Sequence, residues 1–152
     1  MSIIHIEDEF ISLDRCLEII QYYHNSDDTE KYGTTYPINI TNKYSKFQDV
    51  FDKVIKTCLF LSNEKINLQR SEIVKWPVGS FMKPHYDPPC DALSCIIYLN
   101  DNYSGGRTCF HEDIKIKPKT GRSLIFSNSQ YLHSVERIDN EPRYTMSFWF
   151  VY

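Results

Sequence analysis

The sequence predicts a mainly β fold of the α+β class, a sandwich or jelly roll with two N-terminal helices packed on one sheet. Three observations predict it. The composition is 14% aromatic and contains a single alanine, Ala92, which favours strands over a helix bundle. Helical spacing of apolar residues occurs only before residue 70. Alternation with a period of two begins at residue 71.

The length of 152 residues is that of one domain with its own core. We therefore expect a single domain, 1–152, in which residues 1–70 provide helical support and a lid loop and residues 71–152 form the jelly-roll core. A chain of this size needs no disulfide or metal to hold its fold, so a metal here would serve chemistry.

The first predicted helix begins after Ser12, a residue type that is common at N-caps, and ends near His24. A short apolar stretch, residues 3–6, precedes it. The apolar residues expected on one helix face are Leu13, Cys16, Leu17, Ile20 and Tyr23.

Residues 25–43 form a long polar loop with a short strand at 36–40, and loops of this length in compact domains are often lids. The second helix follows it. Ser45 and Gln48 have the spacing of a capping box. A wide apolar stripe then comprises Phe47, Val50, Phe51, Val54, Ile55, Cys58 and Leu59.

Six strands are predicted, at residues 72–76, 93–99, 107–110, 114–117, 123–126 and 144–152. The final strand separates two rows of side chains. The row expected under the helices is Tyr144, Met146, Phe148, Phe150 and Tyr152, and the opposite row is Arg143, Thr145, Ser147 and Trp149. Because buried polar groups must be hydrogen-bonded, the row that carries Arg, Thr and Ser indicates a site inside the fold.

Charge and cysteine usage exclude several classes of protein. The net charge of -3 provides no general basic surface for nucleic acid or anionic membranes. The acidic first ten residues lack a secretory pattern, and no apolar run reaches the roughly 18 residues of a membrane span. Five cysteines without paired spacing are typical of reduced thiols. These features predict a cytoplasmic protein and leave its oligomeric state open, and the composition is also typical of AT-rich genomes, viral ones included.

His85-Tyr86-Asp87 places an imidazole and a carboxylate on one face of an extended segment, where they can share a metal. Such a pair is weak evidence alone. A second pair, in His111-Glu112-Asp113, lies in a polar segment between strands, and we interpret it as a solvated turn. His85 and Asp87 instead follow the turn Pro77-Val78-Gly79 and precede an apolar strand.

His133 supplies a third ligand, and Arg143 follows it across residues 139–142, in a spacing that predicts a hairpin returning Arg143 to the same pocket. Two His and one carboxylate on one face of Fe(II) leave three adjacent positions for a chelating co-substrate and dioxygen. Zinc more often takes a closed or singly open tetrahedron. A buried guanidinium can bind the free carboxylate of a dicarboxylic keto acid in bidentate fashion, and Tyr98 can add a phenolic hydrogen bond.

These residues resemble the Fe(II)- and 2-oxoglutarate-dependent dioxygenases, specifically their prolyl 4-hydroxylase-like branch. The resemblance extends along the chain and depends on the order and spacing of its motifs. The matching segments are residues 6–12 with Cys16, Trp76-Pro77-Val78-Gly79-Ser80-Phe81, His85-Tyr86-Asp87, Ile97-Tyr98-Leu99-Asn100, Gly105-Gly106-Arg107-Thr108-Cys109-Phe110, Pro118-Lys119-Thr120-Gly121, Leu132-His133, and residues 143–149.

The resemblance implies a double-stranded β-helix, the cupin-like jelly roll of this family. His85, Asp87 and His133 resemble its iron ligands, and Arg143 resembles the catalytic-site residue that binds the distal carboxylate of 2-oxoglutarate. The positions that resemble the lining of the co-substrate pocket are Tyr98, Thr108 and Trp149.

The implied activity is hydroxylation with Fe(II), 2-oxoglutarate and dioxygen, with ascorbate as a further reductant. Its implied partner is a peptide or protein substrate that contains proline. Arg143 in place of Lys and Val135 in place of Gly bring the sequence nearer to the oxygen-sensing type of prolyl hydroxylase than to the collagen type. Trp76 in place of the usual Tyr removes a hydroxyl near the metal.

Other functions fit parts of the pattern. The same chemistry can act on a free amino acid or another protein side chain. A non-enzymatic jelly-roll binding module would make the histidines incidental, but it has no reason to place Arg143 inward. A nucleic-acid demethylase of the same superfamily would carry a second arginine where Trp149 stands. Four further residues, Cys90, Cys95, Cys109 and His111, have poor spacing for a structural zinc site, and buried thiols are the better interpretation.

Overall fold

The computed structural model describes residues 2–111 and 113–152. Its helices are α1 (Leu13–His24), the 3₁₀ helix η1 (Tyr44–Lys46) and α2 (Gln48–Ser62). Its strands are β1 (Ile4–Glu7), β2 (Tyr36–Asn39), β3 (Asn67–Trp76), β4 (Met82–His85), β5 (Asp91–Tyr98), β6 (Ser104–Gly105), β7 (Thr108–Phe110), β8 (Ile114–Ile116), β9 (Ser123–Phe126), β10 (His133–Val135), β11 (Ile138–Asp139) and β12 (Arg143–Val151).

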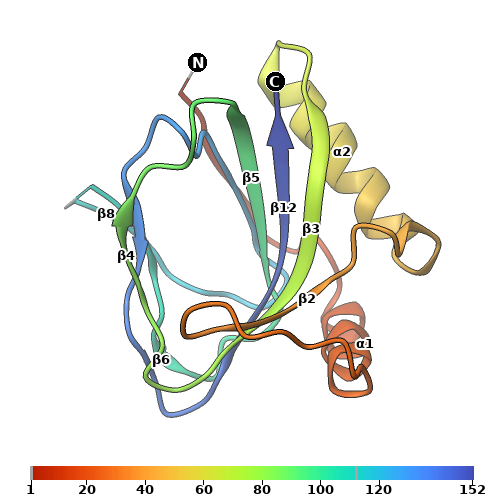
Figure 1. Ribbon diagram of the computed structural model, residues 1–152, viewed down its shortest axis with the longest axis vertical. Coiled ribbons are helices and arrows are strands. Elements are labelled where there is room, and N and C mark those ends of the chain that lie inside the picture. The colour runs from red at the N-terminus through yellow and green to blue at the C-terminus, as the bar shows by residue number, and fades with distance from the viewer. Residues whose placement is uncertain (1, 112) are drawn as a thin grey trace.

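Two antiparallel sheets face each other. The larger has six strands in the order β1-β9-β5-β12-β3-β2, and the smaller has four in the order β4-β10-β7-β8. In Figure 1 the helices lie on one side of the larger sheet, and β4 and β8 lie on the other. This arrangement confirms the predicted mainly β jelly roll with two helices on one sheet. β1 and β2 pair into the larger sheet, so the N-terminal part also contributes strands.

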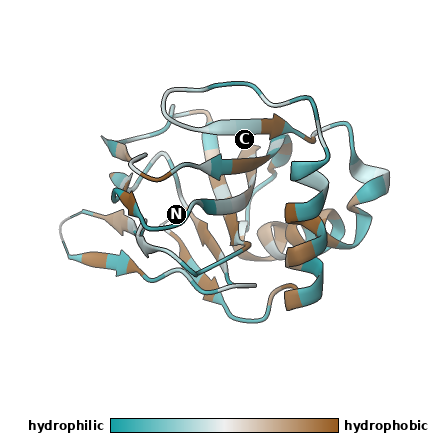
Figure 2. Ribbon diagram, turned by 90° about the horizontal axis from the view of Figure 1, so that it is seen from below, coloured by the Kyte–Doolittle hydropathy of each residue, from teal (hydrophilic) through white to brown (hydrophobic). Residues whose placement is uncertain are grey.

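The apolar core lies between the larger sheet and the helices. Phe148 of β12 meets Phe51 of α2 edge to face, with ring centroids 5.1 Å apart. The predicted apolar row of β12 belongs to this core from Tyr144 to Phe150. Tyr152, predicted for the same row, follows the end of β12 and is exposed. Figure 2 shows hydrophobic and hydrophilic bands alternating along the helices, as expected when one face is buried.

Helix α1 has the predicted bounds. The Ser12 hydroxyl accepts a hydrogen bond from the Arg15 backbone N–H at 3.1 Å, which caps the first turn. The predicted buried face was confirmed for Cys16 and Tyr23 and wrong for Leu13 and Leu17. Leu13 and Leu17 are 63% and 65% exposed, whereas Ile19 is fully buried. The buried residues of α1 are Cys16, Ile19 and Tyr23, which recur about once per turn and form a narrow stripe. The two leucines lie outside this stripe.

Helix α2 begins later than the capping box predicted. Residues 44–46 form η1, so Ser45 lies inside a preceding helix and its side chain caps nothing. Phe47 occupies the N-cap position and is buried, which anchors this end by packing instead of by a side-chain hydrogen bond. Leu59, predicted for the apolar stripe, is exposed. Within the described residues, no helix combines the length and hydrophobicity needed to cross a bilayer.

All six predicted strands are present, but the hairpin prediction was wrong. Neither β10 nor β11 pairs with β12; β10 pairs with β4 and β7, and β12 pairs with β3 and β5. Residues 139–142 therefore connect β11, which pairs with β6 in a two-stranded sheet, to β12 of the larger sheet. Arg143 still faces the interior, because it occupies the inward row of β12.

Candidate active site

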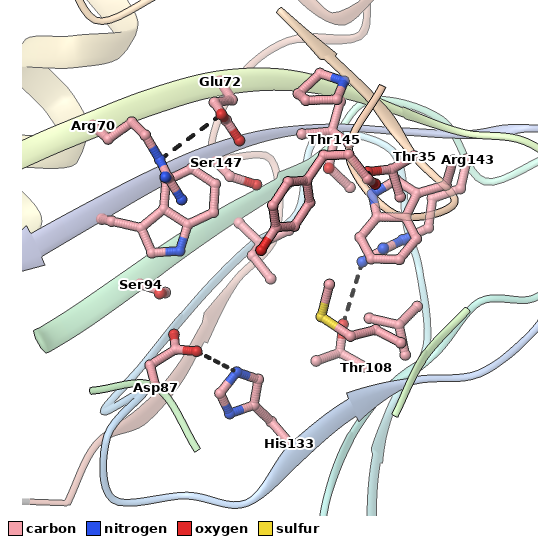
Figure 3. A pocket seen from close by; sticks show the side chains of 18 of the residues that line it. Thr35, Arg70, Glu72, Asp87, Ser94, Thr108, His133, Arg143, Thr145 and Ser147 are labelled. Carbon is pink, nitrogen blue, oxygen red and sulfur yellow. Dashed lines mark hydrogen bonds and ion pairs between the residues drawn. The ribbon is translucent and has the colours of Figure 1, made fainter. Parts of the chain in front are cut away.

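The space between the two sheets is a cavity of about 190 Å³ (Figure 3). It is smaller than the roughly 300–1,000 Å³ of drug-sized sites, so it suits a small ligand. One wall is the inward row of β12 together with inward residues of β3 and β5, and the other comes from β4, β7 and β10. The predicted polar row Arg143, Thr145, Ser147 and Trp149 lines this cavity.

The structure brings together the three predicted metal ligands. His85 ends β4, Asp87 follows it in the loop, and His133 begins β10, directly opposite His85 in the β4–β10 pair. Asp87 Oδ1 lies 3.3 Å from His85 Nε2 and 3.6 Å from His133 Nε2. One ligand atom from each residue lies within 4.8 Å of the others, and this is the one such group of three found among the described residues.

Backbone carbonyl groups orient both imidazoles. His85 Nδ1 lies 2.8 Å from the Lys83 carbonyl oxygen, and His133 Nδ1 lies 2.8 Å from that of Tyr131. Each contact requires Nδ1 to carry the hydrogen, which leaves Nε2 with its lone pair. Burial lowers the pKa of His133, which also favours the neutral ring. Both Nε2 atoms are thus ready to bind a metal.

Asn128 holds the carboxylate of Asp87, a role that sequence reasoning missed. The side-chain NH₂ group of Asn128 donates to Asp87 Oδ2 at 2.9 Å and to Ser94 Oγ at 2.8 Å, and the backbone carbonyl oxygen of Asn128 accepts from the backbone N–H of Asp87. The Asp87 Oδ1 atom is left facing the two imidazoles. No spacing rule pointed to Asn128, which lies in a turn after β9.

Arg143 lies in the cavity with an exposure of 1%. Its guanidinium stacks 4.7 Å from the centre of the Trp76 ring, and Nη2 donates to Thr108 Oγ1 at 3.4 Å. The Tyr98 hydroxyl hydrogen-bonds the same Thr108 oxygen at 2.7 Å. No carboxylate of the described residues lies within 4.0 Å of Arg143, and its Nε and Nη1 atoms, like Trp76 Nε1, are buried without a partner. A buried cation in this state favours an anionic ligand.

The remaining predicted pocket residues divide between two ends of the cavity. Tyr98 and Thr108 lie beside Arg143, as predicted. Trp149 lines the same cavity but pairs with Ser94 and Arg70, six residues along β12 from Arg143, or roughly 20 Å of strand. Trp149 therefore lies at the end where Asn128 binds both Asp87 and Ser94.

Arg70 and Glu72 also line the cavity, and sequence reasoning assigned them no role. They occupy the inward row of β3, which alternates with the buried Ser71 and Ile73 of the helix-covered face. The alternation of inward and helix-facing side chains that identified the polar row of β12 also occurs in β3. Arg70 was missed because the predicted strand began only at residue 72, whereas β3 begins at Asn67. Glu72 lay within the predicted strand but was given no role.

The weaker motifs of the sequence do not form sites in the described residues. His111 lies in an exposed turn, and Glu112 of that motif lies outside the described residues. Cys95 and Cys109 are buried thiols, as predicted, whereas Cys90 is exposed. These cysteines and His111 form no group of three potential ligands in that part of the chain.

The donor set fits an octahedral divalent metal with three open positions. Two imidazole nitrogens and one carboxylate oxygen would hold such a metal, and all three atoms border the cavity. The unpartnered N–H groups of Arg143 and Trp76 fit a carboxylate in that cavity. The residues present therefore fit both Fe(II) and a dicarboxylic keto acid.

Comparison with known proteins identifies the family. The sequence model of the 2OG-Fe(II) oxygenase superfamily matches residues 71–151, more than half of the chain. A protein of Acanthamoeba polyphaga mimivirus, whose name places it among the prolyl 4-hydroxylases, is 27% identical over 109 residues. That match covers 55% of this chain and 45% of the relative, so the chain spans less than half of the length of this curated relative.

Solved structures share the fold at low sequence identity. The viral collagen prolyl hydroxylase of Paramecium bursaria Chlorella virus-1, solved as its 2OG complex, has a TM-score of 0.76 at 20% identity, covering 97% of this chain and 94% of that one. A Trichoplax adhaerens prolyl hydroxylase, solved with a peptide fragment of the hypoxia inducible factor oxygen degradation domain, has a TM-score of 0.79 at 18% identity, covering 97% and 83%. These likenesses confirm the jelly-roll fold.

Proposed function

Because the chain belongs to the 2OG-Fe(II) oxygenase superfamily and resembles its prolyl 4-hydroxylase-like branch, we propose that it is an Fe(II)- and 2-oxoglutarate-dependent hydroxylase of prolyl residues in a peptide or protein. The metal ligands in this proposal are His85, Asp87 and His133. Arg143 binds the distal carboxylate of 2-oxoglutarate, beside Tyr98 and Thr108.

The observation that carries the proposal is the unpaired Arg143. A fully buried guanidinium without a carboxylate partner in the described residues is costly, and it persists only where function or neighbouring groups support it. Trp76 and Tyr98 provide π-faces at 4.7 Å and 5.5 Å, which offset part of this cost. Arg143 lines the same cavity as His85, Asp87 and His133. In this proposal a single small anion therefore reaches both the guanidinium and the metal.

The chain's own residues position the reactants. Bound Fe(II) with 2-oxoglutarate and dioxygen supplies the oxidation, in which the keto acid becomes succinate and carbon dioxide and the substrate gains one oxygen atom. Asn128 and two backbone carbonyl groups fix the three ligands in advance. Arg143 orients the co-substrate by a bidentate ion pair. Ile96, Val74 and Phe126 keep the middle of the cavity apolar, which limits access of water.

In this proposal, residues 25–43 act as a substrate lid on the jelly-roll core of residues 71–152. Tyr32, Thr35 and Pro37 from this segment line the cavity, so a movement of the segment would change its opening. Bound substrate should slow proteolysis within residues 25–43 several-fold, and a segment already fully protected without substrate would contradict the lid.

The experiment that tests the substrate class is a succinate-release screen. Purified protein with Fe(II), 2-oxoglutarate and ascorbate is incubated with proline-containing peptides and, separately, with free amino acids. The proposal expects succinate and a gain of one oxygen atom with at least one peptide. Oxygen gain on a free amino acid alone would overturn the peptide assignment, and the His133→Ala protein provides the blank.

A further inference from the structure

Two charged residues that line the cavity have no part in the proposed function. Among the described lining residues, the charged groups are Asp87 and Arg143, already assigned, and Arg70 and Glu72 on β3. Figure 3 shows Arg70 and Glu72 across the cavity from Asp87 and His133. They lie at the metal end, since Arg70 pairs with Trp149 and Glu72 with Ser147.

The two side chains are close to each other but poorly satisfied. Arg70 Nε lies 3.8 Å from Glu72 Oε2, which is beyond hydrogen-bond distance. No hydrogen bond from the described residues reaches the Glu72 carboxylate, although its side chain is only 18% exposed. Burial also raises the pKa of Glu72, because it disfavours the charged carboxylate. An N–H donor from a ligand in the cavity would give the Glu72 carboxylate the hydrogen bond that it lacks.

Arg70 is held by stacking, and no hydrogen bond within the described residues uses its side-chain N–H groups. Its guanidinium lies 4.3 Å from the centre of the Trp149 ring, and the side chain is 50% exposed. Stacking fixes the plane of the guanidinium and leaves its edge available to an acceptor. Arg70 and Glu72 thus present a donor and an acceptor side by side.

Arg70 also borders a second, open depression on the surface. The other residues that line it are all polar: Asn39, Thr41, Asn42, Lys43 and Gln69. A ligand that extends from the cavity into this depression must pass Arg70, because this residue lines both. The arrangement favours a polymer over a small molecule that the cavity encloses.

We infer that Arg70 and Glu72 form a clamp for the main chain of a peptide substrate, in which Arg70 donates to a carbonyl oxygen and Glu72 accepts a backbone N–H. This inference rests on the proposed function. In an extended chain the N–H and C=O of one residue point to the same side, as they do in a hydrogen-bonded pair of strands. Proline has no N–H, so the clamp holds a residue that flanks the prolyl target.

The clamp is tested by removing each partner of the proposed hydrogen bonds in turn. Substitutions remove the clamp residues, and N-methylation removes the backbone N–H of the peptide. The probes are acetyl-Ala-Ala-Pro-Ala-Ala-amide and four analogues, each with one alanine N-methylated. Binding is measured by calorimetry with Ni(II) in place of Fe(II) and with 2-oxoglutarate present, so that no turnover occurs. The proteins are wild type, Glu72→Gln, Glu72→Leu, Arg70→Met and the control Glu64→Gln, which changes an exposed glutamate after α2.

One N-methylated analogue should bind wild type about 10-fold to 100-fold more weakly than the parent, as expected for a lost charge-assisted hydrogen bond. That penalty should vanish in Glu72→Leu and persist in part in Glu72→Gln, whose amide oxygen still accepts. Arg70→Met should weaken all five peptides by a similar factor, and Glu64→Gln should change none.

An equal N-methyl penalty in wild type and Glu72→Leu would overturn the clamp. So would free proline binding more tightly than the blocked peptide, or no peptide binding to wild type that holds Ni(II) and 2-oxoglutarate. Peptide binding tests the clamp, whereas 2-oxoglutarate binding without peptide tests the proposed function. The two claims can therefore fail separately. Unchanged 2-oxoglutarate affinity in Glu72→Leu and Arg70→Met shows that these variants are folded.

Discussion

The two faces of the six-stranded sheet serve different purposes. On β12, Met146 and Phe148 point toward the helices and are buried in apolar contacts. Their neighbours Thr145 and Ser147 point the other way, into the cavity. Alternation along one strand thus separates the side chains that stabilise the fold from those that form the site.

The faces also differ in how their buried groups are satisfied. The helix-covered face consists mainly of close-packed apolar residues, and its buried Ser71 hydroxyl donates to the Ser147 carbonyl oxygen, so this face needs no ligand. The cavity face holds buried polar and charged side chains, and some of their N–H groups have no partner in the described residues. A native fold retains such groups where a ligand completes them, which is why the cavity face indicates function. Substitutions on the two faces should therefore have separable effects.

The largest effect is expected for His133→Ala. Removing one of three ligands should lower the affinity for Fe(II), Co(II) or Ni(II) by more than about 100-fold, since changes even to residues behind the ligands cost 10–100-fold. The variant should stay folded without metal, because His133 is not part of the apolar core between the larger sheet and the helices. Metal titration and urea unfolding check both points, and metal affinity equal to wild type would remove His133 from the site.

Phe148→Ala tests the opposite face. Loss of the buried ring and its contact with Phe51 should lower the free energy of unfolding by about 3–5 kcal/mol. Affinity for 2-oxoglutarate in the folded fraction should remain that of wild type. Urea unfolding and 2-oxoglutarate titration measure the two, and a comparable loss in 2-oxoglutarate affinity would show that the faces are not independent.

Arg143→Met should have a smaller effect than Phe148→Ala, and it should affect 2-oxoglutarate binding instead of stability. Affinity for 2-oxoglutarate should fall by about 2–4 kcal/mol, because the variant cannot form the charge-assisted pair. The free energy of unfolding should stay the same or rise, since the variant replaces an unpaired buried cation with an apolar side chain. Metal affinity without 2-oxoglutarate serves as the control, and equal losses of metal and 2-oxoglutarate binding would indicate misfolding instead.

The smallest effect is expected for Asn128→Ala. Asp87 would lose a hydrogen bond to Oδ2 but keep its backbone contact, so metal affinity should fall about 10-fold to 100-fold. Asn128→Asp offers a matched change, since a carboxylate there would repel Asp87. Competition between the protein and a metal chelator measures these affinities. Unchanged affinity in both variants would show that Asn128 does not position Asp87.

Sequence patterns located the site because its residues lie on long or distinctive elements. β12 has nine residues, enough for alternation to show that Arg143 points inward and Phe148 toward the helices. The His85-x-Asp87 spacing identified two candidate ligands within one segment, and the structure brings them together with His133. Ser12 identified the start of α1 because an N-cap depends on neighbouring residues alone.

The missed features depend on contacts between distant segments. β4 and β10 have four and three residues, too few for alternation to be visible, and they are strands because each pairs with the other. Asn128 acts only where the fold brings it to Asp87. Leu13 fits a helical stripe as well as Ile19 does, and only the packing of α1 in the fold decides that Ile19 is buried and Leu13 exposed.

The central claim is that this cavity binds Fe(II) and 2-oxoglutarate together. It is tested most directly by adding both to the protein without oxygen and recording the visible spectrum. The account predicts the weak charge-transfer band of an iron-chelated keto acid in wild type, no band in His133→Ala, and a band in Arg143→Met only at much higher 2-oxoglutarate. A folded wild-type protein without the band at saturating Fe(II) and 2-oxoglutarate would contradict the account.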